Sequence, residues 1–246
     1  MKKIIFNWKE NPETLKEAKK IILSVASSAK KYHLSVITAV PFIYLSPLFE
    51  FIKEKGFDKL IKLSSQNVSH QDGGSYTGEV SSKMLKDLGV KYSIIGHSER
   101  RYIFLETNKQ ISLKIQQSNL NKIVPVLCIG EPEKTSLENA FNFVKEQINK
   151  NLSGYKSNDS LIVAYEPVWA IGGNKTVDVD LAVEMINKIK DFLYQKYNKR
   201  IEVLYGGSLN SKNIDEFIKY QEIDGFLVGS ASLIKKEIDY IIKRGK

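Results

Sequence analysis

Eight short apolar runs, separated by segments with helical character, constrain the fold of this chain more than any other feature. Each run is short and rich in β-branched residues, which is typical of buried strands. Eight such strand–helix units in 246 residues predict a single α/β domain over residues 1–246: a closed (β/α)8 barrel, with its active site at the C-terminal ends of the strands. The predicted strands are Ile4–Phe6, Val36–Ala39, Ile61–Ser64, Tyr92–Ile95, Ile123–Cys128, Leu161–Ala164, Ile201–Tyr205 and Gly225–Val228. An open doubly wound sheet is the alternative, but no GxGxxG motif follows the first run.

The segments between the runs carry helix signals. Asn11 as N-cap and Pro12 at the first helical position are predicted to begin the first helix. Asp178 is expected to cap a later helix. The predicted buried stripe of that helix is Leu181, Met185, Ile189, Phe192 and Leu193. Further helices are expected at 107–119, 136–150 and 232–244.

Charge and composition narrow the function classes. The net charge is +9, but the lysines are scattered along helical polar faces and mixed with glutamates, which predicts a solvated surface. Nucleic-acid binding is the weaker alternative. No apolar stretch reaches 18 residues, so we expect no membrane span. The apolar run Ile4-Ile5-Phe6 that follows the two N-terminal lysines is too short for a signal peptide, so we predict a cytoplasmic protein. The single cysteine, Cys128, excludes an intrachain disulfide and is predicted to be a buried structural thiol.

A glutamate stands where the sixth predicted strand ends. Pro167 follows Glu166 and ends the strand, because proline lacks a backbone donor and fixes φ. The segment 167–176 is apolar at its tip and carries paired glycines, a composition that suits a lid closing over polar chemistry. An ordinary βα loop with a chance glutamate is the alternative. If the barrel is correct, other functional residues should also follow strands.

Two such residues follow the first and fourth strands. Lys9 would place a compact cation over the barrel mouth, suited to a phosphate or a developing oxyanion; the alternative is a surface lysine. His97 follows Gly96, which permits a tight turn, and is expected at the start of a helical turn that keeps its ring neutral. Ser98 and Glu99 are expected to hold the neighbouring groups in place. The alternative for His97 is a structural histidine.

Glycine-containing turns follow the seventh and eighth strands. They are Gly206-Gly207-Ser208 and Gly229-Ser230. Glycine lets the backbone approach a ligand closely, and the N–H groups of two turns can converge on an anion. Each turn alone is a weak signal, but both together at this corner of a barrel predict phosphate binding.

In this order and spacing, the segments resemble triosephosphate isomerases. They are Asn7-Trp8-Lys9, Gly96-His97-Ser98-Glu99-Arg100-Arg101, Tyr165-Glu166-Pro167-Val168-Trp169-Ala170-Ile171-Gly172 and Tyr205-Gly206-Gly207-Ser208. The resemblance implies interconversion of dihydroxyacetone phosphate and D-glyceraldehyde 3-phosphate, in glycolysis and gluconeogenesis, without cofactor or metal. It implies that Glu166 is the base, that His97 is a neutral electrophile and that Lys9 stabilises the enediolate.

The same resemblance implies further roles. The residues implied to bind substrate are Asn7, Lys9, Gly172, Ser208, Gly229 and Ser230. Those implied to form the lid are Pro167, Val168, Trp169, Ala170, Ile171, Gly172, Gly173, Asn174, Lys175 and Thr176. The long loop 67–79 is implied to insert into a second subunit, with Thr77 near that subunit's site, so a homodimer is expected whose separated monomers lose activity.

The chain departs from the family pattern at the lid and in the turn after the eighth strand, and also at Phe6 and Val40, where only adjustments in packing are expected. Gly173-Asn174 replaces a usual Thr-Gly pair in the lid, and Ser230 stands where a second glycine is usual. The added Ser230 hydroxyl either binds the phosphate or crowds it. The rival functions are a different phosphosugar-binding barrel and an inactive relative, although the intact Lys9, His97 and Glu166 argue against an inactive one.

Overall fold

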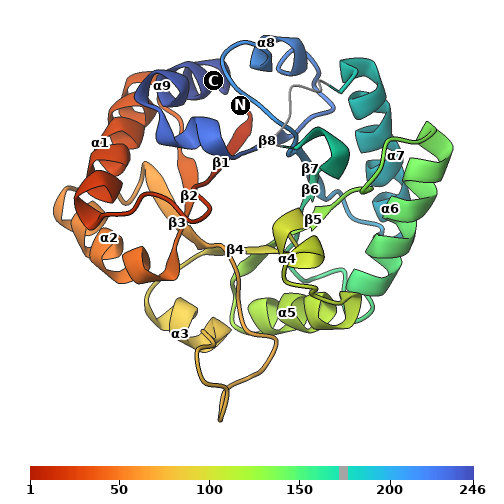
Figure 1. Cartoon of the computed structure of the whole chain (residues 1–246), viewed down its shortest axis with the longest axis horizontal. Coiled ribbons are helices and arrows are strands. Elements are labelled where there is room, and N and C mark those ends of the chain that lie inside the picture. Colours follow the sequence, from red (N-terminus) through yellow and green to blue (C-terminus); the bar gives the residue numbers. More distant parts are fainter. Residues whose placement is uncertain (172–176) are drawn as a thin grey trace.

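Eight parallel strands close into a barrel in the computed structural model, which describes residues 1–171 and 177–246. Each strand pairs with the next, and β8 pairs with β1, with Ile4 opposite Phe226. The predicted (β/α)8 barrel is therefore confirmed, and the open doubly wound sheet is wrong (Figure 1). The strands are β1 (Lys3–Asn7), β2 (Val36–Val40), β3 (Ile61–Ser65), β4 (Tyr92–Ile95), β5 (Val124–Ile129), β6 (Ile162–Tyr165), β7 (Glu202–Tyr205) and β8 (Gly225–Val228).

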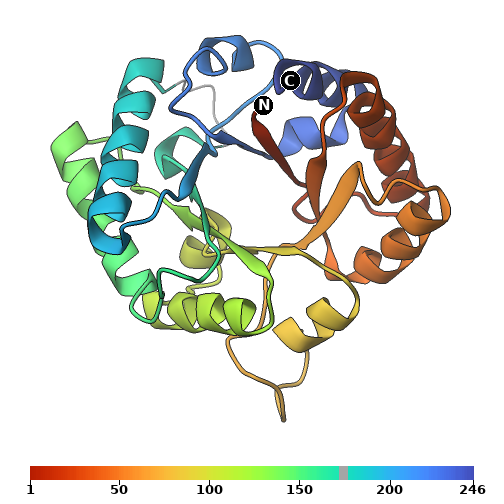
Figure 2. The same ribbon diagram turned by 180° about the vertical axis from the view of Figure 1, so that it is seen from behind.

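Helices surround the barrel, as Figures 1 and 2 show from its two ends. They are α1 (Leu15–Tyr32), α2 (Phe42–Glu54), α3 (Ser82–Asp87), α4 (Ser98–Tyr102), α5 (Asn108–Leu120), α6 (Leu137–Asn151), α7 (Val179–Tyr197), α8 (Ile214–Phe217) and α9 (Lys235–Arg244). Two short 3₁₀ helices, η1 (Val168–Ala170) and η2 (Ser230–Leu233), lie in connections that follow β6 and β8. Within the described residues, no helix is long and apolar enough to cross a membrane.

The strands are buried on both faces, which explains why they are continuous apolar runs rather than alternating ones. Ile5 points into the barrel, where it packs in a cluster with residues such as Val126 and Leu204. Its neighbours Ile4 and Phe6 point outwards into the larger core between strands and helices. This alternation follows from the two-residue period of a strand. Cys128 lies in the inner cluster and is buried, as predicted.

The first helix begins later than the sequence suggested. Thr14, not Asn11, is the N-cap: its side-chain oxygen accepts a hydrogen bond from the Glu17 N–H at 3.3 Å, and α1 starts at Leu15. Pro12 lies before the helix, where its carbonyl accepts a hydrogen bond from the Tyr44 hydroxyl of α2 at 2.9 Å. Asn and Thr are both good N-cap residues. The segment that contains Pro12 packs against α2, and the helix begins after it, at the second of the two capping residues.

Two other helix predictions need correction. Asp178 caps α7 as predicted, but Leu181 is 48% exposed, and Ala182 and Ile186 are buried instead. Met185, Ile189 and Leu193 are buried as predicted and Phe192 is partly buried, so the predicted stripe is wrong at Leu181 alone. The last helix begins at Lys235 and not at 232, because the residues before it form η2. That difference places the start of η2 directly after Gly229.

The connection between β3 and α3 projects away from the barrel in both views (Figures 1 and 2). It contains the loop 67–79 that the sequence singled out. Thr77 is exposed on it, as is Tyr76, whose side chain is 46% exposed. A long polar segment that projects from the barrel buries little of its own surface, which is typical of a segment that contacts another molecule.

Candidate active site

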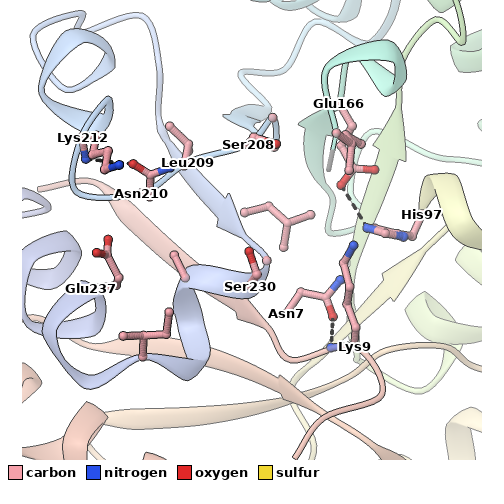
Figure 3. Close-up of a pocket in the computed structure, with 17 residues that line it drawn as sticks. Asn7, Lys9, His97, Glu166, Ser208, Leu209, Asn210, Lys212, Ser230 and Glu237 are labelled. Atoms are coloured by element: carbon pink, nitrogen blue, oxygen red, sulfur yellow. Dashed lines mark hydrogen bonds and ion pairs between the residues drawn. The ribbon is translucent and has the colours of Figure 1, made fainter. Parts of the chain in front are cut away.

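A cavity of about 530 Å³ opens where the strands end. It brings together ten of the residues singled out from the sequence: Asn7, Lys9, His97, Glu166, Ile171, Gly206, Gly207, Ser208, Gly229 and Ser230. Asn7 is the last residue of β1, and the others follow β1, β4, β6, β7 and β8, as expected for a barrel of parallel strands. Figure 3 shows the side chains of Asn7, Lys9, His97, Glu166, Ser208 and Ser230 around the opening. Thr77 is not among the lining residues, since it lies on the projecting loop.

Glu166 is the most buried acid of this cavity, with 2% of its surface exposed. Its backbone N–H donates to the Ile129 carbonyl at 2.7 Å, so pairing with β5 continues one residue beyond β6. Gly206 makes room for the side chain: a Cβ added there would lie 2.7 Å from Glu166 Cγ and 3.3 Å from its Oε1. The position of the Glu166 carboxylate therefore depends on the absence of a side chain at Gly206, in the loop that follows β7.

His97 is the N-cap of α4, as predicted, and Gly96 before it has a φ of +68°. The Glu99 backbone N–H donates to His97 Nδ1 at 3.3 Å. Since a backbone amide always carries its hydrogen, Nδ1 is the acceptor, and the ring proton is on Nε2. His97 Nε2 lies 3.4 Å from Glu166 Oε1 (Figure 3). The ring thus directs a donor towards the space in front of the carboxylate.

Glu99 links this histidine to Lys9. Its carboxylate accepts from Lys9 Nζ at 2.6 Å, while its other oxygen lies 3.4 Å from His97 Nδ1. Because the Lys9 ammonium group already donates to the Glu99 carboxylate, the carboxylate does not need a hydrogen bond from His97 Nδ1, which can remain without a proton. Lys9 has a φ of +54°, an uncommon conformation for a side-chain-bearing residue, and its N–H donates to Asn7 Oδ1 at 3.1 Å. Ser98 is buried at the first position of α4.

The other side of the cavity is built from the two glycine-containing turns. Ser208 lies after β7, and its hydroxyl donates to the Ala170 carbonyl at 3.0 Å. Gly229 and Ser230 follow β8 and lie at the start of η2. Beyond them, Asn210, Lys212 and Glu237 also line the cavity, as Figure 3 shows.

Sequence reasoning did not find these last three residues. Asn210 and Lys212 follow the Gly206-Gly207-Ser208 turn closely, and that proximity was the available signal. Glu237 lies inside α9, where nothing in the sequence separates it from a solvated helix residue.

The described part of the predicted lid is held by Glu131. Residues 167–171 include η1, and the Trp169 indole N–H donates to Glu131 Oε1 at 2.7 Å. The Tyr165 hydroxyl lies 3.1 Å from the same oxygen. Burial raises the pKa of Glu131, and these two donors act in the opposite direction. The remaining predicted lid residues, Gly172, Gly173, Asn174, Lys175 and Thr176, lie outside the described residues.

Among residues 1–171 and 177–246, no group of three His, Cys, Asp or Glu side chains is placed to hold a metal ion. The described cavity instead combines a buried carboxylate, a neighbouring imidazole, a lysine and two turns suited to an anion. A (β/α)8 barrel with such a cavity belongs to a class suited to proton transfer on an anionic substrate.

Comparison with known sequences identifies the family within that class. The profile of the family described as triosephosphate isomerase matches residues 2–245. A triosephosphate isomerase of Mesomycoplasma hyopneumoniae is 40% identical, over 98% of this chain and 99% of the relative. One from Alkaliphilus metalliredigens is 38% identical, over 92% of both chains, and one from Mycoplasma capricolum is 38% identical, over 96% of both. The chain belongs to the triosephosphate isomerase family.

Proposed function

We propose that Glu166, His97 and Lys9 carry out the reaction of this family, the interconversion of dihydroxyacetone phosphate and D-glyceraldehyde 3-phosphate, in the cavity described above. As a family member, the chain is an isomerase of triose phosphates with a place in glycolysis and gluconeogenesis. The observation that carries the residue roles is the 3.4 Å separation of His97 Nε2 and Glu166 Oε1 in a cavity whose other side holds Ser208, Gly229 and Ser230.

The reaction moves one proton between neighbouring carbons. The Glu166 carboxylate removes a proton from C1 of dihydroxyacetone phosphate, and the electron pair of that C–H bond forms the enediolate. His97 Nε2–H donates to the carbonyl oxygen on which negative charge develops, and the ring then transfers protons between the two oxygens. Glu166 returns its proton to C2, which gives the aldehyde. Glu166 and His97 end the cycle as they began it, as an isomerase requires.

Lys9 and the two turns bind charge. Lys9 is held by Asn7 and Glu99 with its ammonium group at the cavity, where it stabilises the enediolate and the phosphate dianion. Backbone N–H groups of Ser208, Gly229 and Ser230 bind the phosphate in this proposal, together with that of Gly172, which lies outside the described residues. In this proposal a lid over residues 167–176 excludes water and holds the C–O bond to the phosphate in the plane of the enediolate, which suppresses elimination of the phosphate.

A coupled assay tests this proposal. Wild-type protein is expected to convert D-glyceraldehyde 3-phosphate to dihydroxyacetone phosphate, and Glu166→Gln, which keeps the shape of the side chain but removes its basicity, is expected to lose about 10³-fold or more in kcat. Binding to duplex DNA, measured across a salt series, tests the competing reading of the net charge. Absence of isomerisation together with salt-dependent DNA binding would support that competing reading.

We also propose a homodimer that uses the loop 67–79. Apolar side chains are exposed on and near this loop, with Tyr76 at 46% and Met84 of α3 at 62%. After α4, Ile103, Phe104 and Leu105 are each more than 60% exposed. Exposed apolar groups of this size are typical of association surfaces. Light scattering is expected to give the mass of two chains, and dilution to the monomer is expected to abolish activity; a fully active monomer would contradict this proposal.

The cellular location and the single-domain organisation of the chain are also proposals. The place of the reaction in glycolysis supports a cytoplasmic location, which fractionation of cells with a specific antibody tests. Residues 1–246 are proposed to act as one catalytic domain, because the strands at both ends of the chain pair in the same barrel, β1 with β8. Limited proteolysis that released an active fragment would contradict it.

A further inference from the structure

Glu237 connects two parts of the chain that meet at the cavity. It lies in the first turn of α9, where its Oε2 accepts a hydrogen bond from the Ser211 backbone N–H at 2.6 Å. Its Oε1 accepts from the Ser211 hydroxyl at 2.8 Å. Both carboxylate oxygens thus hold one residue of the loop that follows β7. Hydrogen bonds to an ionised acceptor are stronger than neutral ones, and two in parallel also fix the geometry.

The held loop is the one that carries Ser208. Within it, the Asn213 side chain donates to the Ser208 carbonyl at 2.8 Å and accepts from the Asn210 N–H at 2.9 Å. The Lys212 N–H donates to the Asn210 side chain at 2.8 Å. These hydrogen bonds hold residues 208–213 together, so a change in the position of Ser211 also changes the position of Ser208.

The other end of the contact leads to the second turn. α9 follows η2 after one residue, and η2 begins at Ser230, directly after Gly229. Glu237 thus stands on the segment that continues from Gly229 and Ser230, while Ser211 stands on the segment that continues from Ser208. The contact therefore bridges the two segments that continue from the turns lining this side of the cavity.

We propose that Glu237 is a positioning residue for phosphate binding, which acts by tying the loop after β7 to α9 and does not itself bind the substrate. The inference rests on the proposed function, because it assumes that Ser208, Gly229 and Ser230 bind the phosphate. Without the contact the two turns must be ordered when the anion binds, and that ordering weakens binding by about 3- to 10-fold.

Glu237 lines the same cavity as these turns, so its negative charge could also weaken phosphate binding by repulsion. Substitutions at Glu237 distinguish this repulsion from the positioning role. If the carboxylate mainly repelled the phosphate, its removal would tighten binding. If it positions the turns, Glu237→Ala weakens binding, whereas Glu237→Gln keeps most of it. The amide oxygen of glutamine can accept from the Ser211 N–H, and its NH₂ group can donate to the Ser211 hydroxyl, which also accepts.

The test uses the full chain and two readouts of the phosphate site. Inorganic phosphate is the probe for Kd, and D-glyceraldehyde 3-phosphate is the substrate for KM and kcat. Glu237→Ala is expected to raise the Kd of phosphate and the KM about 3- to 10-fold. Isomerisation of D-glyceraldehyde, which lacks the phosphate, is expected to remain within about twofold of wild type, because it does not use the turns.

Glu216→Ala is the matched control, since Glu216 is exposed on α8 and its removal changes the net charge equally. Ser211→Ala removes only the hydroxyl bond and is expected to shift the Kd in the same direction by a smaller factor, which also covers the case that Glu237→Ala does not fold. Equal Kd values in Glu237→Ala and Glu216→Ala, or tighter binding in Glu237→Ala, would overturn the positioning role alone. A wild-type protein that neither binds phosphate nor isomerises the substrate would overturn the proposed function as well.

Discussion

Gly206→Ala tests whether the position of Glu166 limits the rate. A Cβ at residue 206 would lie 2.7 Å from Glu166 Cγ, whereas ordinary carbon contacts begin at about 3.4 Å. The acid must therefore move by about 0.7 Å, and a misplacement of about 1 Å costs on the order of 100-fold in rate. Scaled to the smaller shift, kcat is expected to fall roughly 10- to 30-fold. Overpacking is expected to lower the free energy of unfolding by about 1–3 kcal/mol.

The assay compares kcat with thermal unfolding and phosphate binding. Gly154→Ala is the matched control: it adds the same methyl group at a residue that does not line the cavity, and the three nearest atoms belong to the flexible Gln116 side chain. That variant is expected to keep the wild-type kcat. Gly206 belongs to one of the two turns that line the cavity, so the phosphate Kd of Gly206→Ala shows whether that turn is disturbed as well. The Kd is expected to change less than kcat, because the three nearest atoms to the added methyl all belong to Glu166. A Gly206→Ala enzyme with kcat within twofold of wild type would refute the reasoning that the missing side chain positions the base.

Three further outcomes follow from the site. Glu166→Asp, which retracts the carboxylate by about 1 Å, is expected to lower kcat on the order of 100-fold, and near wild-type turnover would remove Glu166 from the role of base. Ser230 lines the cavity with its side chain exposed, so Ser230→Ala is expected to weaken phosphate binding about 3- to 10-fold, and tighter binding would instead show crowding. Burial raises the pKa of the Cys128 thiol well above its ordinary value, so at pH 8 an aromatic disulfide reagent is expected to label native protein at least about 100-fold more slowly than unfolded protein; equal rates would contradict the buried placement.

The sequence predicted the barrel because each strand can be recognised from its own residues. Each is a short apolar run such as Ile162–Tyr165, buried on both faces, and a run of that kind has few alternatives once eight of them recur at regular spacing. The residues around the cavity were also accessible, since polar side chains such as Lys9, His97 and Glu166 stand directly after strands.

What the sequence did not predict depends on contacts between distant residues. The N-cap of α1 is Thr14 instead of Asn11, a choice between two good capping residues that propensity alone does not decide. The exposed face of α7 includes Leu181, because the phase of a helix is set by what it packs against. The contact of Glu237 with Ser211 joins residues 26 positions apart, and no local pattern indicates it.

Deuterium transfer tests the central claim, that the Glu166 carboxylate moves the substrate proton, most directly. Isomerisation of D-glyceraldehyde 3-phosphate is run in D₂O by wild type and by Glu166→Gln, and the product is read by NMR for deuterium at the carbon that receives the proton. Because a carboxylate exchanges its proton with solvent, wild type is expected to form dihydroxyacetone phosphate that carries deuterium at C1. Glu166→Gln is expected to slow both turnover and deuterium incorporation by about 10³-fold or more. Deuterium incorporation by Glu166→Gln at the wild-type rate would contradict the account.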